Sequence, residues 1–176
     1  NNSHKKEKIL LRLNSIKDIK EPKILELNAG EGVLWGEIEK KLKRKFDRTR
    51  VDKKQILGAL SGDNRKIIPQ INLENYNVID CDVYGVPFDQ IDAIFKNNTL
   101  QKGTIIHYTF ILVHIAVKIK LINEIGISKE MAQKKPVFFY NKLYEAFKSY
   151  LYKKGIKTIQ HIEIVDKIKY YGYYKI

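Results

Sequence analysis

The stretch ILELNAGEGVLWGEI, residues 24–38, contains the change of pattern that decides the fold. It begins as a short apolar run typical of a buried strand and passes through a loop of small residues. From Val33 to Leu42 the apolar residues then recur at helical spacing. In open α/β sheets, ligands bind beyond the carboxyl ends of the strands, and the first strand usually leads to that place. The loop at residues 28–32 is therefore the first candidate for a ligand site.

Two common phosphate-binding motifs do not fit this loop. A dinucleotide site needs a third glycine three residues after the second, and Trp35 stands there, with Gly36 one residue late. A P-loop would continue with Gly-Lys-Ser or Gly-Lys-Thr, which the sequence lacks. The pattern that fits is an acidic residue followed by Gly-x-Gly, formed by Glu26, Gly30 and Gly32. The alternative is a strand-to-helix turn that binds nothing.

The rest of the chain alternates between strand-like and helix-like stretches. We expect an amphipathic leading helix that ends before Pro22. We expect strands at residues 23–28, 46–52, 56–60, 76–82, 103–113, 157–165 and 168–176, and further helices at 33–42, 65–71, 86–97, 114–124 and 136–154. Such alternation predicts a mostly parallel, doubly wound sheet. The two last strands are joined too tightly for a crossover, so they should be antiparallel.

Length and composition predict one soluble domain. With 176 residues and no repeat or linker, the chain should form a single domain, residues 1–176, in which residues 1–22 are an N-terminal basic helix. Cys81 is the sole cysteine, which excludes an internal disulfide and a cysteine-based zinc site. The sequence shows neither the apolar core of a signal peptide nor a membrane-spanning run. We therefore expect a cytoplasmic protein without membrane contacts.

The chain is strongly basic, with 33 Lys and Arg against 20 Asp and Glu, a net charge of +13. This charge suits a polyanionic partner such as nucleic acid, which is bound through phosphate contacts and counterion release. Biased composition rich in Lys, Ile and Asn explains the same charge equally well. The basic stretch from Lys40 to Arg50 is either a path for a phosphate backbone or a solvated helix face, and from the sequence we favour the solvated face.

A pair of carboxylates marks the end of the strand at residues 76–82. Asp80 and Asp82 lie on the same face of the strand, because side chains alternate between faces. Burying two like charges so close together is costly unless a ligand or hydrogen bonds compensate them. The pair therefore indicates a site. The alternative is a capped helix start in which Tyr84 serves as packing.

The segment ILELNAGEG resembles the first motif of the class I S-adenosylmethionine-dependent methyltransferases. In that family the acidic residue at the strand end and the glycine loop hold the methionine part of the cofactor. The resemblance implies that Glu26, Asn28, Gly30 and Gly32 contact S-adenosylmethionine, although Asn28 stands where many members have the first glycine. It also implies the strand order 3-2-1-4-5-7-6. A Trp35 side chain that filled the hollow would contradict this interpretation.

Two further segments extend the resemblance along the chain. Asp52 ends the second strand 22 residues after Gly30, near the spacing at which an acidic side chain meets ribose hydroxyls in such folds. The segment Gly62-Asp63-Asn64 resembles the one that family members place against the adenine. Asp63 would accept from the exocyclic amine and Asn64 would face the ring. Ordinary turn or capping roles for these residues are the alternatives.

The segment Asp82-Val83-Tyr84-Gly85-Val86-Pro87 resembles the reactive motif Asp-Pro-Phe/Tyr-Gly-Ser-Pro of the tRNA guanine N2-dimethyltransferases. Val83 and Val86 depart from it. The resemblance implies that Asp82 accepts a hydrogen bond from the target amine and that Tyr84 stacks on the base. Asp80 would contact the cofactor or order the loop. His107, on the next strand, faces either this site or the core, and we favour the core.

These patterns together predict a methyltransferase that modifies an exocyclic amine of a nucleic-acid base, with RNA favoured over DNA. A small-molecule or protein methyltransferase is one alternative. A module that binds the cofactor without turnover is another, which the departure at Val83 favours. We expect no metal site, because the histidines have no partner at metal-ligand spacing.

Overall fold

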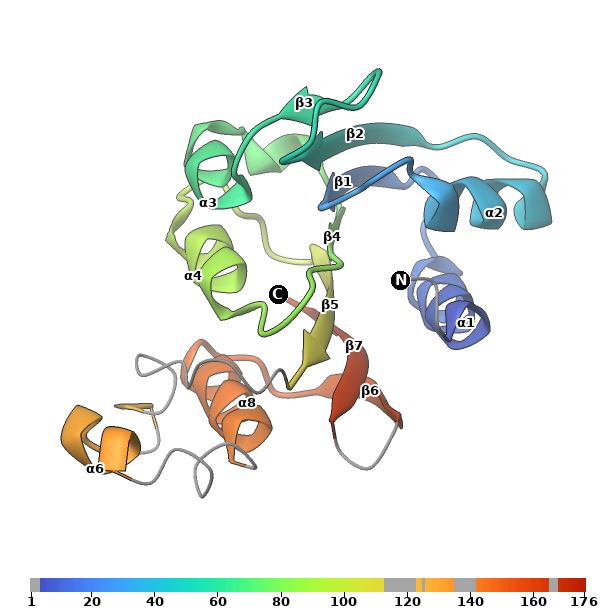
Figure 1. Ribbon diagram of the computed structural model, residues 1–176. Coiled ribbons are helices and arrows are strands. Elements are labelled where there is room, and N and C mark those ends of the chain that lie inside the picture. The colour runs from blue at the N-terminus through green and yellow to red at the C-terminus, as the bar shows by residue number, and fades with distance from the viewer. Residues whose placement is uncertain (1–3, 113–122, 125, 135–141, 165–167) are drawn as a thin grey trace.

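The chain forms a seven-stranded sheet with helices on both faces in the computed structural model, which describes residues 4–112, 123–124, 126–134, 142–164 and 168–176 (Figure 1). The strands are β1 (Lys23–Leu27), β2 (Asp47–Asp52), β3 (Leu60–Ser61), β4 (Val78–Cys81), β5 (Ile105–Ile111), β6 (Ile159–Ile164) and β7 (Lys169–Lys175). Their order is β3-β2-β1-β4-β5-β7-β6. Strands β1 to β5 pair in parallel, and β7 is antiparallel to both β5 and β6. The predicted fold class and strand order are confirmed.

The helices divide between the two faces of the sheet. They are α1 (Lys5–Ile16), α2 (Val33–Leu42), α3 (Asn64–Ile67), α4 (Phe88–Lys96), α6 (Lys129–Lys134) and α8 (Leu143–Lys153), with 3-10 turns η1 (Ile68–Gln70) and η2 (Leu73–Asn75). Helices α1 and α2 lie on one side of the sheet in Figure 1, and α3, α4 and α8 lie on the other. No helix in the described part of the chain has the length and apolarity needed to cross a bilayer.

Alternation along β1 separates two apolar cores. Ile24 points to the smaller core, where it packs with Trp35 and Ile38 of α2. Leu25 and Leu27 point to the larger core, which holds the apolar faces of α4 and α8. Burial of these side chains stabilises the fold by about 25 cal/mol for each Å² of apolar surface that is removed from water. The central strands are therefore covered on both faces, which explains their near-continuous apolar sequences.

The third strand was predicted at residues 56–60, and this placement is wrong. In the structure β3 comprises Leu60 and Ser61, which pair with Val51 and Asp52 of β2. The apolar run before it contains a turn, and its Leu57 side chain is 96% exposed. The apolar composition of the run predicted a strand, but the run lies at the edge of the sheet and its Leu57 side chain stays exposed to solvent.

The carboxy-terminal pair of strands agrees with the sequence. Strands β6 and β7 form an antiparallel pair in which Gln160 faces Tyr173 and Ile162 faces Tyr171. Of the helix predicted at residues 136–154, the described part is α8, while α6 was not predicted. The helix predicted at residues 114–124 lies almost entirely outside the described residues.

Candidate active site

A cavity of about 340 Å³ opens at the carboxyl ends of β1 and β4. One wall is the glycine loop between β1 and α2, and the opposite wall is the segment that follows β4. Its polar and aromatic lining comprises Lys8, Asn28, Glu31, Asp82, Tyr84, Thr109, Lys169 and Tyr171. The volume lies in the range of roughly 300 to 1,000 Å³ that is typical of small-molecule sites. The position is the one where ligands bind in doubly wound sheets.

The glycine loop is held in a left-handed conformation at three of its residues. The φ angles are 60° at Asn28, 53° at Gly30 and 69° at Gly32. A Cβ added at Gly30, which lines the cavity, would meet no atom within 4 Å. A Cβ at Gly32 would lie 2.5 Å from Nη2 of Arg48. Gly30 thus leaves open space beside the cavity, whereas a side chain at Gly32 would displace the Arg48 guanidinium, and the positive φ angle favours glycine at both positions.

Asp52 is brought to this loop by the second strand. Its Oδ2 accepts a hydrogen bond from the Gly30 amide at 2.8 Å, and its Oδ1 accepts one from the Lys54 amide at 2.9 Å. Each carboxylate oxygen has a further lone pair available. Asp52 is therefore placed at the edge of the loop with acceptor capacity to spare.

The two residues expected against the adenine lie in different surroundings. Asn64 is buried and its amide donates to the side chain of Asn28, while its own Oδ1 has no partner among the described residues. Asp63 caps α3 and forms an ion pair with Arg65. Hydrogen bonds from Arg65 lower the pKa of Asp63 to about 2. The structure thus joins Asn64 to the loop through Asn28, but neither Asn64 nor Asp63 lines the cavity.

Glu26 also lies outside the cavity lining. Its carboxylate is buried and accepts a hydrogen bond from Nε of Arg48 at 2.6 Å, and Arg48 further contacts Glu39 and the Gly32 carbonyl. Burial raises the pKa of Glu26 to about 7, although the guanidinium of Arg48 opposes this rise. The role of Glu26 in cofactor binding stays a prediction, and its visible partner is Arg48.

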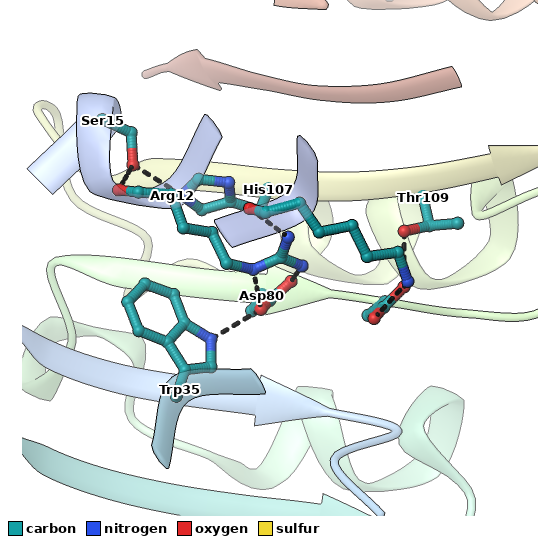
Figure 2. A network of polar contacts seen from close by, with 8 residues as sticks. Arg12, Ser15, Trp35, Asp80, His107 and Thr109 are labelled. Atoms are coloured by element: carbon teal, nitrogen blue, oxygen red, sulfur yellow. Dashed lines mark hydrogen bonds and ion pairs between the residues drawn. The ribbon is translucent and has the colours of Figure 1, made fainter. Parts of the chain in front are cut away.

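Asp80 is held in a buried polar network beneath α1 (Figure 2). Nε and Nη2 of Arg12 each donate to the Asp80 carboxylate at 2.7 Å, and Nε1 of Trp35 donates at 2.6 Å. Burial by itself would raise the pKa of Asp80, but the Arg12 guanidinium holds it below its ordinary value. The carboxylate is therefore compensated by protein groups alone. Its role as a cofactor contact stays a prediction.

Asp82 faces the cavity and is held by two other residues. Nζ of Lys8 lies 2.7 Å from Oδ1 and 2.8 Å from Oδ2, and the Thr109 hydroxyl donates to Oδ1. The same ammonium lies 4.9 Å from the centroid of the Tyr171 ring. Among the described residues, Oδ1 thus accepts from two donors and Oδ2 from one. Because a carboxylate oxygen can accept two hydrogen bonds, Oδ2 retains one free position.

The two ion pairs have matching spacing on the helix and on the strand. Lys8 and Arg12 are one helical turn apart, about 6 Å at a rise of 1.5 Å per residue. Asp80 and Asp82 are two residues apart on an extended chain, about 6.6 Å. Since Lys8 pairs with Asp82 and Arg12 pairs with Asp80, α1 runs antiparallel to β4. The helix therefore supplies a counter-charge for each carboxylate of the predicted pair.

The segment after β4 is fixed without the proline of the related motif. The Val83 amide donates to the Cys81 carbonyl at 3.0 Å, a bond that proline could not form. The Gly85 carbonyl accepts from the Ile111 amide at 2.8 Å. Val83 is buried, whereas the Tyr84 side chain is 77% exposed at the cavity. This turn therefore presents an aromatic ring to solvent beside Asp82.

Trp35 and His107 lie behind the site and do not line the cavity. The ring centroids of Trp35 and His107 are 6.0 Å apart, and Nε2 of His107 lies 2.8 Å from the Ser15 hydroxyl (Figure 2). Burial lowers the pKa of His107 to about 3. The preference for a core histidine is confirmed. Trp35 is fully buried and leaves the cavity open, while binding of the cofactor there stays a prediction.

Sequence reasoning missed Lys8, Glu31, Thr109, Lys169 and Tyr171, which line the cavity, and Arg12, which lies behind it. Two basic residues one turn apart on an amphipathic helix, Lys8 and Arg12, are an unusual feature, but nothing in the local sequence links them to Asp80 and Asp82. The described residues contain no group of three His, Cys, Asp or Glu side chains that could hold a metal ion.

The same fold occurs in solved methyltransferases. An S-adenosylmethionine-dependent methyltransferase from Archaeoglobus fulgidus matches with a TM-score of 0.55 at 10% identity, over 99% of this chain and 95% of its own. The plantazolicin methyltransferase BamL, solved with S-adenosylhomocysteine, matches with a TM-score of 0.53 at 10% identity, over 97% of this chain and 83% of its own. A Podospora anserina methyltransferase bound to S-adenosylhomocysteine matches with a TM-score of 0.50 at 10% identity, over 98% of this chain and 77% of its own.

At these identities the likeness establishes a common fold. No protein-family model matches the sequence, and no curated protein matches it. The fold expected from the resemblance, that of the class I methyltransferases, is confirmed. The resemblance to the tRNA guanine N2-dimethyltransferases stays a prediction.

Proposed function

We propose that this chain, which has the fold of the class I methyltransferases, binds S-adenosylmethionine in the cavity and methylates an exocyclic amine of an RNA base. The observation that carries the proposal is one arrangement of residues. An open left-handed glycine loop at Gly30 faces Asp82 and the exposed Tyr84 across a cavity of about 340 Å³. A ligand-sized space is thus bordered by a loop that a bulky ligand can approach and by an acceptor for an amine.

The residues around the loop fit the chemical groups of this cofactor. Asp52 has lone pairs available for ribose hydroxyls, and the unpartnered Oδ1 of the buried Asn64 is an acceptor without a protein donor. Glu31, an exposed carboxylate on the cavity wall, is placed to offset the ammonium charge of the methionine part. We assign Glu31 this electrostatic role in preference to Glu26, whose carboxylate is taken by Arg48.

The chemistry proposed for this chain is positioning. S-adenosylmethionine, when bound, would supply the methyl group: a carbon–nitrogen bond would form, the sulfur would keep the electron pair of the broken carbon–sulfur bond, and the amine would release one proton to solvent. The free position on Oδ2 of Asp82 accepts a hydrogen bond from the acceptor amine and thereby directs its lone pair. Lys8 and Thr109 hold the carboxylate in place. Alignment of this kind can supply effective molarities of roughly 10⁵ to 10⁸ M.

RNA is favoured as the substrate by two features of the chain. The net charge of +13 suits a polyanion. Tyr84 offers an exposed ring next to Asp82, and stacking on such a ring is worth about 1 to 3 kcal/mol per base in single-stranded nucleic acids. An unpaired base stacked on Tyr84 would bring its amine to the carboxylate.

Thermal unfolding tests the cofactor assignment. At a concentration of about 100 Kd, S-adenosylhomocysteine should stabilise the folded chain by about 2.7 kcal/mol. For a chain of this size that corresponds to a rise in Tm of about 5 to 10 °C. NAD is the matched control and should leave Tm unchanged. A shift with NAD, or none with S-adenosylhomocysteine, contradicts the assignment.

Methyl incorporation tests the reaction and the substrate. The chain is incubated with S-adenosylmethionine labelled in the methyl group and total RNA, with and without ribonuclease treatment. Label that enters RNA, is removed by ribonuclease and falls roughly 10²-fold or more with Asp82→Asn supports the proposal. Label that survives ribonuclease indicates a protein or small-molecule substrate. Stabilisation by S-adenosylhomocysteine without incorporation would indicate a binding module.

A further inference from the structure

A second hollow, of about 720 Å³, runs along the outer side of α2 against β2. We call it the α2 groove. Six cationic side chains line it, against three carboxylates. The cations are Lys40, Lys43, Arg44, Lys45, Arg48 and Arg50, and the carboxylates are Glu31, Glu37 and Glu39. The α2 groove is therefore a basic surface, with three more positive than negative charges.

Pairing within the protein does not remove this excess. Glu37 pairs with Lys5, which lies outside the α2 groove, and Glu39 is taken up mainly by Arg48 at 2.9 Å. Lys40 and Lys43 are exposed and form no ion pair or side-chain hydrogen bond among the described residues. These ammonium groups are therefore available to an external anion.

Compensation of the helix dipole explains only some of the basic residues in the α2 groove. Basic side chains in the last turn of a helix offset its negative end, which explains Lys40 and Lys41 of α2. The helix ends at Leu42, and the cations continue past it at Lys43, Arg44 and Lys45. Side chains beyond the helix end add little to its stability through the dipole, since the effect falls off within the last turn. Arg44 donates to the Ile19 carbonyl and lies over the Phe46 ring, and Lys45 lies 3.9 Å from Glu39, so Lys40 and Lys43 are the cations of the α2 groove that these contacts leave for an external anion.

The α2 groove adjoins the cavity of the proposed active site. Glu31 and Val33 line both hollows, at the amino end of α2. From there the α2 groove follows the helix, whose ten residues span about 15 Å. An extended chain lying in the α2 groove would thus reach the glycine loop, where the two hollows share Glu31 and Val33.

We propose that the α2 groove binds the phosphate backbone of single-stranded RNA and directs the adjoining base into the cavity. The inference rests on the proposed function, because it takes an RNA base as the methyl acceptor. The lysines supply phosphate contacts without reading sequence. Tyr84 supplies the stacking surface at the end of the path. The substrate is therefore an unpaired segment of RNA.

The test is the salt dependence of binding to a 20-nucleotide single-stranded RNA of mixed sequence that carries a fluorescent label. Each phosphate contact contributes about −0.7 to the slope of log K against log salt concentration. The triple variant Lys40→Gln, Lys43→Gln, Lys45→Gln should make the slope shallower by about 2. It should also weaken binding at 100 mM NaCl about tenfold or more. Anisotropy titrations at 50 to 200 mM NaCl give both quantities.

The matched control carries Lys102→Gln, Lys129→Gln and Lys157→Gln, three exposed lysines elsewhere on the molecule. It has the same net charge as the groove variant and should keep the wild-type slope and affinity. S-adenosylhomocysteine should raise Tm equally in all three proteins, which shows that the cavity is unaffected.

Three results would overturn the inference. One is an equal loss of RNA affinity in the groove variant and the control, which would reduce the effect to net charge. The second is competition by polyglutamate as effective as that by unlabelled RNA at equal charge. The third is an absence of RNA binding by the wild type at 50 mM NaCl. If S-adenosylhomocysteine still stabilises the protein in that case, cofactor binding survives, and methyl incorporation into RNA then decides whether the RNA substrate is lost together with the α2 groove.

Discussion

The two oxygens of the Asp82 carboxylate are not equivalent in this structure. Within the part of the chain that the structure describes, Oδ1 accepts from both Lys8 and Thr109, while Oδ2 accepts from Lys8 alone. The free position on Oδ2 can accept from a substrate only as long as Lys8 and Thr109 keep the carboxylate from rotating. The proposed function therefore makes Lys8, a residue of the amino-terminal helix, a positioning residue for Asp82.

Replacement of Lys8 should lower turnover without weakening cofactor binding. Lys8→Met keeps much of the side-chain length but removes the ammonium that holds Asp82. A misplacement of about 1 Å can cost about 10²-fold in rate, so a loss of that order in kcat is expected. Lys8→Arg should recover part of it, because a guanidinium can still pair with the carboxylate. Methyl incorporation measures the rate, and the rise in Tm with S-adenosylhomocysteine measures binding.

Lys5→Met is the control for this experiment, because Lys5 lies on the same helix and pairs with the partly exposed Glu37. It should leave kcat within about twofold of the wild type, as exposed ion pairs contribute little. Equal losses of kcat in the Lys5 and Lys8 variants would indicate general damage to α1 and would contradict the positioning role.

His107 should make the fold sensitive to acid. Burial lowers its pKa from 6.5 to about 3, and the nearby Arg12 guanidinium acts in the same direction. Between these values the unfolded chain binds a proton that the folded chain does not, so stability falls as the pH is lowered from 6.5. His107→Phe removes the titrating group. The free energy of unfolding of the wild type should fall relative to the variant by about 1.4 kcal/mol per pH unit.

Urea unfolding between pH 4.5 and 6 measures this difference. Other titrating groups act in the same window, and Glu26, whose pKa is raised to about 7, has the opposite sign. They are present in both proteins and cancel when the two curves are subtracted. Parallel curves for the wild type and His107→Phe would show that His107 does not stay neutral in the fold.

At the scale of the element, α1 is attached to the sheet by charge as well as by apolar packing. Its Arg12 guanidinium is buried against Asp80, and breaking such a pair leaves an uncompensated buried charge. Arg12→Met should therefore lower the free energy of unfolding by about 3 to 5 kcal/mol. Adding Asp80→Asn should recover most of this loss, since the neutral amide oxygen can still accept from Trp35. Urea unfolding at pH 7 measures both variants.

A double variant that is no more stable than Arg12→Met alone would contradict this account. It would mean that the unpaired charge of Asp80 is not what destabilises the Arg12→Met variant. Lys5→Met serves again as the exposed comparison, and it should cost less than about 1 kcal/mol.

Helices and central strands follow from local pattern, whereas the edge of the sheet does not. Helix α2 was predicted with its observed bounds, because residues 33–42 carry a clear helical period after the glycine loop. Strand β3 was misplaced, because it depends on pairing with Val51 and Asp52 and not on its own apolar run. Helix α6 has six residues, too few for a periodic signal to stand out. Pairing with a neighbour is a long-range property that a local pattern does not contain.

The candidate site was predicted in part for the same reason. The carboxylates Asp80 and Asp82 were recognised from their alternation on one strand, and their common face is confirmed by the partners that α1 provides. Those partners lie about seventy residues earlier in the chain. No local rule links Lys8 or Arg12 to them, so sequence reasoning left both carboxylates open for ligands. In the structure Asp82 lines the cavity, whereas Asp80 is buried and hydrogen-bonded to Arg12 and Trp35.

At the scale of the whole molecule, the positive charge is concentrated on the surface. The buried cations are balanced, as Arg12 pairs with Asp80 and Lys8 pairs with Asp82. The excess of +13 is therefore carried largely by exposed side chains, including those of the α2 groove. Mutual repulsion among them opposes the compact state.

Moderate salt should therefore stabilise the protein when no ligand is present. At 20 mM NaCl the repulsion extends over more than 10 Å, and at 200 mM it is largely screened, while the buried pairs are screened much less. A gain of about 1 kcal/mol would raise Tm by about 2 to 4 °C. The lysine-to-glutamine variant of the α2 groove has three fewer charges, a net +10 from the +13 of the wild type. Because the repulsion energy scales with the square of the net charge, the rise in Tm of this variant with added NaCl should be about six tenths of the rise in the wild type. A fall in Tm with added NaCl would show instead that exposed ion pairs outweigh the repulsion.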